Sequence, residues 1–179
     1  MTSVGRELRT TQIGLLSDSH GNVRRTLEAA SLLIREGAGI LIHLGDVGTA
    51  EVLESLAQAR EESVKNPVEI HIVFGNVDCE LRRLSSCARE LGLSVDHPLG
   101  RISHAGKVLL FQHGHVKSDM EVALAREVDY LCHGHTHVRR DDRVGRIRVI
   151  NPGALQRAAV HTVALLDMRA DELRFFTLG

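Results

Sequence analysis

Residues 11–22 read TQIGLLSDSHGN and combine an apolar half with a polar half. Its apolar first half predicts a short buried strand, and its polar second half predicts a loop with Asp18 and His20 at the end of that strand. Asn22 is suited to cap the amphipathic helix that we expect over residues 22–36. In open α/β sheets, ligands bind at the loops beyond the carboxyl ends of strands. This unit therefore predicts both a fold class and the position of a site.

The N-terminal half repeats this order of strand, polar loop and helix, whereas the C-terminal half favours hairpins. We expect strands over residues 11–17, 40–44, 68–74, 101–103, 107–112, 130–132, 138–140, 146–150, 162–168 and 172–176. We expect helices over residues 22–36, 50–62, 78–91 and 120–127. Hairpin turns are expected at Ala105 and Gly106 and around Asp141, Asp142 and Gly145. The mixture predicts an α/β (α+β) fold, either as one mixed sheet or as two sheets packed face to face with helices outside.

The composition indicates an ordinary globular protein. Of the 179 residues, 43% are apolar and 25% are charged, and we expect one domain over residues 1–179. The formal net charge of -1 excludes nucleic-acid binding by bulk charge, and the aromatic content of 3% excludes a base-stacking platform. No segment approaches the roughly 18 uncharged apolar residues of a membrane span, so we expect no membrane association.

The cysteines and the first residues bear on the location of the protein. Cys79, Cys87 and Cys132 are an odd number without CxxC spacing, which favours free buried thiols in a reducing compartment. Residues 1–10 contain no apolar stretch that could act as a signal sequence. We therefore expect a cytoplasmic protein.

Five of the expected strands lead directly into Asp, Asn or His beside a glycine. These loops are Asp18-Ser19-His20-Gly21, Gly45-Asp46, Gly75-Asn76, His113-Gly114-His115 and Gly134-His135-Thr136-His137. Glycine lets the backbone turn sharply, which can bring the polar side chains together. A single Asp or His at a strand end is more often a helix cap or a loop residue, but five such loops in this order favour one metal site.

The residue types and their spacing suit divalent metal ions. Carboxylate, neutral imidazole and amide oxygen are ligands for Mn²⁺, Fe, Zn²⁺, Ni²⁺ or Mg²⁺. Residues two apart in an extended segment share a face, so His135 and His137 could reach one cluster and bind a different ion each. Asp18 and His20 have the same spacing, and Asp46, alone on its loop, has two oxygens that could bridge two ions.

These motifs resemble the signature of the calcineurin-like metallophosphoesterases, in which D-x-H, G-D, G-N, an isolated H and G-H-x-H follow in this order. The short length and the G-N-V-D form at residues 75–78 are similar to the small phosphodiesterase branch of bacteria and archaea, which is related to the retromer scaffold subunit. Asn151-Pro152-Gly153 resembles the N-P-G turn of that branch, so the resemblance extends over residues 11–153. It implies a four-layer αββα metallophosphoesterase fold, a β-sandwich of two mixed sheets flanked by helices, with a dinuclear metal centre on one edge.

The resemblance also implies which residues hold the metals. One ion would be bound by Asp18, His20, Asp46 and His137, and the other by Asp46, Asn76, His113 and His135. Asp46 would bridge the ions and hold the hydroxide that attacks the phosphorus in line. Two divalent ions are the implied cofactor, with Mn²⁺ expected and Ni²⁺, Fe, Zn²⁺ or Mg²⁺ as alternatives. Asn76 and Asn22 are candidates for substrate binding.

One position departs from many relatives, which have a histidine after the G-N pair that is thought to protonate the leaving group. Val77 stands there and cannot donate a proton, so good leaving groups should be favoured unless another side chain acts as the acid. His115, two residues beyond His113, is a candidate for that acid, although a supporting or surface role fits it equally well. We expect a structural role for His133, and His43 could support a ligand.

Two classes of function remain. The first is a metal-dependent phosphoesterase, specifically a phosphodiesterase that hydrolyses a small phosphoester. The second is a non-catalytic metal-binding interaction or scaffold module of the retromer-subunit type. All seven ligand positions have residues able to bind metal, which favours the enzyme. Association into a homo-oligomer is left open.

Overall fold

The computed structural model of the protein describes residues 12–63 and 67–179. Residues 1–10, where we expect no signal sequence, lie outside the described residues, as does Thr11 at the start of the first predicted strand. Within the described ranges, no helix has the length and apolar character needed to cross a membrane. One domain over residues 1–179 stays a prediction.

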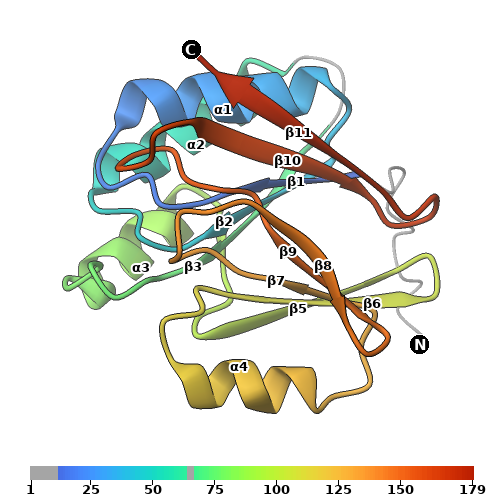
Figure 1. Ribbon diagram of the computed structural model, residues 1–179. Coiled ribbons are helices and arrows are strands. Elements are labelled where there is room, and N and C mark those ends of the chain that lie inside the picture. The colour runs from blue at the N-terminus through green and yellow to red at the C-terminus, as the bar shows by residue number, and fades with distance from the viewer. Residues whose placement is uncertain (1–11, 64–66) are drawn as a thin grey trace, which may run out of the picture.

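Two mixed β-sheets form the framework of the molecule (Figure 1). The strands of the larger sheet are β1 (Gln12–Leu16), β2 (Ile40–Leu44), β3 (Glu69–Val73), β4 (Ser94–Val95), β10 (His161–Asp167) and β11 (Glu172–Leu178). Their order is β11-β10-β1-β2-β3-β4. Strands β1 to β4 run parallel to one another. β10 pairs antiparallel with β1, and β11 pairs antiparallel with β10.

The second sheet has five strands. They are β5 (Leu99–His104), β6 (Lys107–Gln112), β7 (Tyr130–Cys132), β8 (Arg140–Val144) and β9 (Ile147–Asn151), in the order β5-β6-β7-β9-β8. The three central strands run parallel, and the edge strands β5 and β8 pair with them antiparallel. Each sheet therefore has a group of parallel strands whose carboxyl ends meet at one edge.

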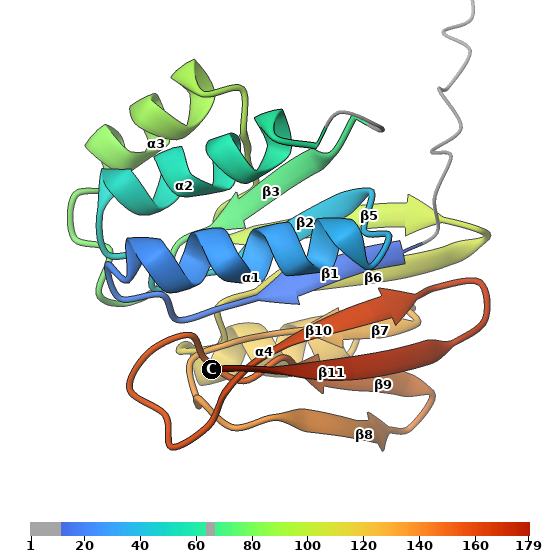
Figure 2. The same cartoon turned by 90° about the horizontal axis from the view of Figure 1, so that it is seen from above.

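Helices cover the outer faces of both sheets (Figures 1 and 2). α1 (Val23–Arg35), α2 (Ala50–Glu61) and α3 (Leu81–Glu90) lie over the six-stranded sheet, and α4 (Lys117–Leu124) lies against the five-stranded sheet. The layers therefore follow the order helix, sheet, sheet, helix. This arrangement confirms the predicted β-sandwich with helices on its outer faces.

The central strands are apolar on both faces, because one face packs on the other sheet and the opposite face packs on helices. In β2, Ile42 belongs to the core between the sheets, and Leu41 belongs to the core beneath α1 and α2. In β6, Phe111 packs between the sheets, and Leu110 packs toward α4. Two-sided burial explains why the sequence shows continuous apolar runs in these strands.

Several elements have the bounds that the sequence predicts. β2, β6 and β7 match their predicted ranges, and the hairpin turn at Ala105 and Gly106 is confirmed. Asn22 is the N-cap of α1, and its side-chain oxygen accepts a hydrogen bond from the Arg25 N–H at 3.1 Å. α3 begins at Leu81, three residues later than predicted.

The second predicted hairpin forms, but its first strand lies at other residues than predicted. Its first strand, β8, covers Arg140–Val144 and not residues 138–140, so Asp141 and Asp142 lie in the strand and the turn falls at Gly145 and Arg146. β8 is an exposed edge strand of charged residues, which gives no apolar alternation for sequence reasoning to follow.

Two further elements differ from the prediction. The two-residue strand β4 was not predicted. α4 begins at Lys117 and ends at Leu124, and not at residues 120 and 127. Its N-cap position, Val116, makes no side-chain capping bond, so the usual signal for a helix start is missing.

The three cysteines are free, as predicted, but only one of them is buried. Cys132 is buried in the core between the sheets, Cys87 is partly exposed on α3, and Cys79 is exposed. The expectation of buried thiols is therefore wrong for Cys79 and Cys87. Both lie in or beside the short helix α3, which has only one face against the sheet.

Candidate metal centre

The backbone of the polar loops is unusual at the predicted ligands. Five of these seven residues have a positive φ angle. They are Asp18 (57°), His20 (43°), Asp46 (54°), His135 (66°) and His137 (58°). Such angles are uncommon for residues with a side chain, although Asp and His tolerate them better than most, and they gather at functional sites.

The prediction that His135 and His137 share one face of an extended strand is wrong. They do not lie in an extended strand, because β7 ends at Cys132 and both residues are in the irregular loop that follows. Their rings also diverge: His135 lies beside His113, with ring centroids 5.2 Å apart, and His137 lies beside His20, with centroids 5.1 Å apart. Left-handed turns, and not strand alternation, direct the two side chains.

The first predicted ligand set forms a compact group. The candidate ligand atoms of Asp18, His20, Asp46 and His137 all lie within 4.8 Å of one another. His137 Nε2 lies 3.2 Å from Asp18 Oδ1 and 3.2 Å from His20 Nε2. His20 Nε2 lies 3.6 Å from Asp46 Oδ2. These four residues could hold one metal ion.

The protonation pattern of this group fits a cation. The Nδ1 atom of His137 lies 3.2 Å from the carbonyl oxygen of Arg157 and donates its proton there, so Nε2 presents a lone pair to the group. Asp18 Oδ1 is buried and makes no hydrogen bond within the part of the chain that the structure describes. Two acceptors facing each other at 3.2 Å repel unless a positive ion lies between them.

The second predicted set lies on the other side of Asp46. His113 Nδ1 donates to the carbonyl oxygen of Leu44 at 2.8 Å, which leaves Nε2 for a metal. That Nε2 atom lies 3.3 Å from Asp46 Oδ1 and 3.2 Å from the side-chain oxygen of Asn76. The His135 ring completes this side next to His113. Acceptor atoms from these residues again face one another, as ligands of a cation do.

Burial and charge shift the pKa values of these carboxylates in opposite directions. Burial raises the pKa of Asp18 above its usual value of 3.8, because removal from water disfavours the charged carboxylate. Burial also acts to raise the pKa of Asp46, but the adjacent His113 ring and the hydrogen bond from the Val77 N–H outweigh it and lower the pKa to about 2. Asp46 is thus a strongly ionised carboxylate, as a bridging ligand requires.

The electrostatics around His20 involve a residue that the sequence did not single out. Burial lowers the pKa of His20, the Asp46 carboxylate opposes that shift, and the positive charge of Arg157 adds to it. His20 is therefore held in the neutral form that binds metals. Arg157 lies on the loop between β9 and β10.

Glycines beside the ligands allow the loops to approach closely. A Cβ atom on Gly75 would collide with Asp46 Oδ1 and would lie 2.7 Å from His113 Nε2. A Cβ atom on Gly134 would collide with the Ser17 hydroxyl and lie 2.9 Å from Asp18 Oδ2. The G-N and G-H pairs of the sequence are therefore steric requirements of the two ligand sets.

This ligand arrangement coincides with a match to a known protein family. A family model described as the calcineurin-like phosphoesterase superfamily domain matches residues 12–171. The chain belongs to the calcineurin-like phosphoesterase superfamily. It is thus a member of a family of phosphoester hydrolases.

Relatives in this superfamily match most of the chain. Phosphodiesterase MJ0936 of Methanocaldococcus jannaschii is 25% identical over 171 residues, which cover 93% of this chain and 99% of that protein. Phosphodiesterase YfcE of Escherichia coli is 29% identical over 145 residues, which cover 78% of this chain and 76% of that protein.

Solved structures of the superfamily share the fold. The structure of an archaeal phosphodiesterase superposes with a TM-score of 0.81 at 25% identity and covers 93% of this chain and 99% of that chain. Vps29 of Entamoeba histolytica superposes with a TM-score of 0.59 at 18% identity, covering 94% of this chain and 99% of that one. The likeness to Vps29 shows the fold alone.

Asp78, the last residue of the G-N-V-D motif, organises the loops of this superfamily member. Its buried carboxylate accepts hydrogen bonds from the backbone N–H groups of Val47 (3.2 Å), Gly48 (2.8 Å) and Gly75 (2.8 Å). It therefore ties the loop of Asp46 to the loop of Asn76, and it also explains the late start of α3. Sequence reasoning gave Asp78 no role, although its place in the motif was a usable signal.

The N-P-G turn supports the G-H-T-H loop. The side-chain amide of Asn151 donates to the carbonyl oxygen of Gly134 at 2.8 Å and to the hydroxyl of Thr136 at 3.1 Å. His133 is buried beside it, and its Nδ1 lies 3.1 Å from the Gly134 carbonyl oxygen. His133 therefore contacts the back of the loop and is no member of the ligand group, in agreement with its expected structural role.

His43 supports the first loop from below, as the sequence suggested. It is fully buried, and its Nε2 lies 2.8 Å from the hydroxyl of Ser19. The hydroxyl of Thr26 on α1 donates to the same Ser19 oxygen at 2.9 Å. Burial lowers the pKa of His43 to about 3, so the ring stays neutral. This series of hydrogen bonds from His43 through Ser19 to Thr26 holds the backbone between Asp18 and His20 in place.

The two other predicted residues, His115 and Asn22, differ in their contacts. His115 is exposed next to the second ligand set, with its ring centroid 5.3 Å from that of His113 and 6.2 Å from that of His135. Asn22 is engaged at both ends of its amide, because its Oδ1 caps α1 and its Nδ2 donates to Gln156 Oε1 at 3.0 Å. Substrate binding by Asn22 and by the exposed Asn76 stays a prediction.

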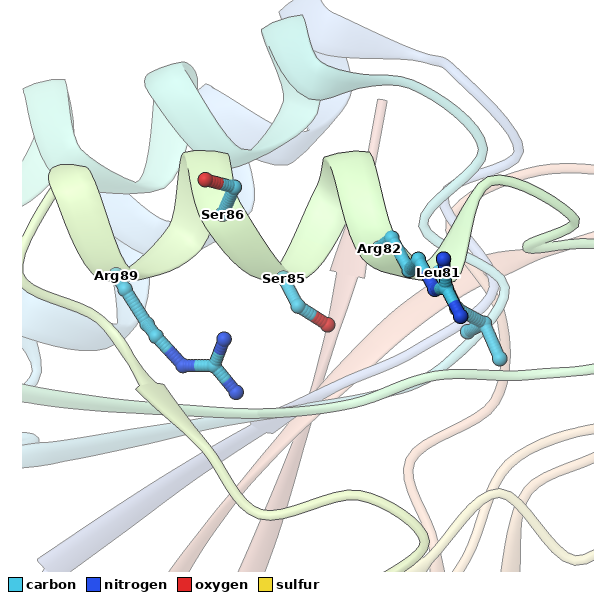
Figure 3. Close-up of a pocket in the computed structure, with 5 residues that line it drawn as sticks. All are labelled: Leu81, Arg82, Ser85, Ser86 and Arg89. Atoms are coloured by element: carbon cyan, nitrogen blue, oxygen red, sulfur yellow. The ribbon is translucent and has the colours of Figure 1, made fainter.

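A shallow depression on α3 lies apart from the ligand group (Figure 3). It is lined by Leu81, Arg82, Ser85, Ser86 and Arg89, all from the same helix. In the close-up, Ser85 and Arg89 point to one side of the helix and Ser86 points to the other. None of these side chains belongs to a strand-end loop, so the depression adds nothing to the candidate metal centre.

Proposed function

We propose that this protein is a metal-dependent phosphodiesterase with two divalent ions, Mn²⁺ being the expected metal. The observation that supports this proposal is the orientation of Asp46. Its Oδ2 atom faces the group of Asp18, His20 and His137, and its Oδ1 atom faces His113. A carboxylate that directs one oxygen to each of two ligand sets is suited to bridge two ions.

The proposed chemistry assigns a task to each side chain. When bound, two ions would supply a hydroxide nucleophile at neutral pH and would stabilise negative charge on the phosphoryl oxygens. His113 and His137 present their Nε2 lone pairs because backbone carbonyls take their Nδ1 protons. The exposed amide of Asn76 lies at the outer side of the second set, where it can also contact a phosphoryl oxygen.

The names of the relatives favour a diester over a monoester. Both MJ0936 and YfcE are named phosphodiesterases. The low aromatic content offers little base stacking, so we propose a small phosphoester substrate. The exposed and free Cys79 is compatible with the proposed cytoplasmic location.

We propose His115 as the acid that protonates the leaving group, because Val77 cannot do so. The His115 ring is exposed and adjoins His113 and His135, so it can reach a group bound at the second ligand set. In contrast, the backbone N–H of Val77 donates to Asp46 Oδ1 at 3.1 Å. Val77 therefore contributes to the orientation of Asp46 through its main chain.

A non-catalytic scaffold of the retromer-subunit type is the alternative. The Vps29 structures share the fold at 18% identity. Because this module would also bind metal, the ligand group and its left-handed backbone fit both functions, and metal-dependent turnover distinguishes them.

The deciding experiment is hydrolysis of bis(p-nitrophenyl) phosphate by the purified protein with Mn²⁺ and after chelation. We expect turnover that depends on Mn²⁺, and Asp46→Asn should lower kcat by more than the roughly 10- to 100-fold typical of losing a residue that supports a ligand. Asp142→Asn, an equivalent change on the exposed edge strand β8, should leave kcat unchanged. Absence of metal-dependent turnover in the wild-type protein would exclude the enzyme and favour the scaffold.

The acid is tested by varying the leaving group. His115→Asn should slow hydrolysis of phenyl esters by about 100-fold and should barely affect p-nitrophenyl esters, since only the poor leaving group needs a proton. Val77→His should raise the rate on phenyl esters in the His115→Asn background. Equal losses on both ester classes would show that His115 is not the acid.

A further inference from the structure

The loop between β9 and β10 is anchored beside the candidate metal centre. The Leu155 N–H donates to the carbonyl oxygen of Ser17 at 3.0 Å, directly before Asp18. Arg25 Nη1 donates to the Leu155 carbonyl oxygen and to Gln156 Oε1, both at 3.0 Å. These bonds hold the loop against the end of β1 and the first turn of α1.

Arg157 follows this anchored pair, and its main chain contacts a predicted ligand. Its carbonyl oxygen accepts the Nδ1 proton of His137 at 3.2 Å. Its φ angle is 56°, a left-handed conformation that a residue with a side chain rarely adopts. Strained residues of this kind persist where the surrounding structure determines them, and five predicted ligands share the property.

The side chain of Arg157 is exposed and has no carboxylate partner among the residues that the structure describes. Over residues 12–63 and 67–179, its guanidinium makes no hydrogen bond or ion pair within the protein. The backbone carbonyl of the same residue contacts His137 of the first ligand set at 3.2 Å. A residue with an unpaired guanidinium therefore adjoins the group of carboxylates and imidazoles.

Nearby arginines are engaged in other contacts. Arg25 is used to anchor the loop through its two hydrogen bonds from Nη1. Arg139, two residues beyond His137, stacks its guanidinium over the ring of Phe175 on β11 at 5.4 Å from the centroid. Unlike Arg25 and Arg139, Arg157 has a guanidinium without a partner among the described residues.

We propose that Arg157 is a substrate-binding residue whose guanidinium contacts a non-bridging phosphoryl oxygen at the metal centre. The planar fork of N–H donors matches phosphate geometry, and charge-assisted bonds of this kind are about twice as strong as neutral ones. This inference rests on the proposed function, because it concerns the same site. It adds a side chain that no strand-end motif contains.

The test compares Arg157→Ala, Arg157→Lys and Arg157→Gly with the wild-type protein. Arg157 already has a Cβ atom, so alanine adds no backbone strain, and glycine removes the strain while keeping the carbonyl that His137 uses. Arg139→Ala is the matched control, since it removes the same charge from a nearby position that faces Phe175.

Two binding measurements accompany the kinetics. We expect Arg157→Ala to raise KM for bis(p-nitrophenyl) phosphate and lower kcat/KM by about 10- to 100-fold, with part of the loss restored in Arg157→Lys. Calorimetric titration of inorganic phosphate into Mn²⁺-loaded protein should show a similar loss of affinity. Arg157→Gly should match Arg157→Ala, and Mn²⁺ affinity and the Arg139→Ala variant should be unchanged within about twofold.

The outcomes separate this inference from the proposed function. If wild-type turnover is metal-dependent but Arg157→Ala keeps its KM and phosphate affinity, only the role of Arg157 is wrong. If Mn²⁺ affinity falls together with phosphate affinity, Arg157 acts structurally through His137, and the inference is overturned. If the wild-type protein shows no turnover, the proposed function fails, and phosphate titration alone decides whether Arg157 binds the anion.

Discussion

The two ends of the β-sandwich both contain buried or half-buried aspartates, but the partners of these aspartates differ. At the carboxyl ends of the parallel strands, Asp18 and Asp46 face imidazole rings, and Asp18 Oδ1 makes no hydrogen bond within the described residues. At the opposite end, Asp171 in the β10–β11 turn accepts hydrogen bonds from Arg148 (2.8 Å), Arg143 (2.7 Å) and Tyr130 (2.9 Å).

The difference distinguishes a site from a structural network. Asp171 is fully compensated by cations and a hydroxyl, so it joins the two sheets and needs nothing from outside. Asp18 is buried against imidazoles and the His135 N–H, none of which carries a fixed positive charge, so a bound metal ion would compensate its charge. A carboxylate facing histidines is therefore the better marker of function than a carboxylate paired with arginine.

The largest expected effect concerns the packing of the metal end. Gly75→Ala would drive its Cβ into Asp46 Oδ1 and against His113 Nε2, displacing the carboxylate that faces both ligand sets. We expect a fall in kcat of at least about 100-fold, since a displacement of about 1 Å has such effects in active sites. Steady-state kinetics with bis(p-nitrophenyl) phosphate measures it.

The matched change at the opposite end is Gly145→Ala in the β8–β9 turn. A Cβ there meets nothing within 4 Å, and only the positive φ of 60° is unfavourable. The expected cost is about 1–2 kcal/mol in the free energy of unfolding with kcat unchanged. Similar losses of kcat in both variants would contradict the distinction between the two ends.

The second prediction concerns stabilisation by metal. Mn²⁺ at 100 times its Kd should add about 2.7 kcal/mol to the free energy of unfolding of the wild-type protein. Asp18→Asn should abolish most of that gain, because it removes a charged oxygen from the first ligand set. Without metal, the same variant should be more stable than the wild-type protein at pH 7, since burial disfavours the Asp18 charge. Thermal and chemical denaturation with and without Mn²⁺ measure both effects.

The third prediction reverses this pattern at the opposite end. Asp171→Asn should destabilise the metal-free protein by about 1–2 kcal/mol, a value reduced because 33% of the side chain is exposed. The stabilisation by Mn²⁺ should remain. A loss of the Mn²⁺ effect in this variant would mean that the network at this end also controls the metal centre.

The smallest effects lie in the pH dependence of the metal-free protein. Asp171 has a lowered pKa because Arg148 and Tyr130 outweigh its burial, so its contribution is complete above the usual value of 3.8 and is lost as pH falls through the folded-state pKa. Asp18 has a raised pKa, so its unfavourable charge disappears as pH falls from 7 toward 3.8.

The free energies of unfolding of the two variants should therefore approach that of the wild-type protein in different pH ranges. The stability advantage of Asp18→Asn should shrink between pH 7 and about 4, and the deficit of Asp171→Asn should shrink below about pH 4. Urea denaturation at a series of pH values gives both differences. Convergence in the same window would show that the two carboxylates have similar environments.

Sequence reasoning was most successful where the signal is local. β2 and β7 are short apolar runs that lead into glycine-containing loops, and their predicted bounds hold. It failed for β8, whose charged residues pair with β9 through main-chain bonds that leave no mark on the side-chain pattern. The two-residue strand β4 exists only because β3 offers it an edge.

The same division applies to the candidate site. The strand-end motifs predicted which residues would gather, and the structure brings Asp18, His20, Asp46 and His137 together. The reason proposed for the direction of the histidine pair was wrong, because φ angles in a loop are set by contacts with other loops. The loop-organising role of Asp78 depends on N–H groups from two segments.

The superfamily and the identities of the metal-binding candidates can be predicted from the amino-acid order, because these depend on residue types next to strand ends. The direction of each oxygen of Asp46, the ring nitrogen that His137 presents and the position of Arg157 beside it depend on how the loops pack. Arg157 lies 20 residues beyond His137, and its position beside that ring follows from the bonds of its loop to β1 and α1. Contacts between distant segments form only when the strands and helices pack, so no local pattern encodes them.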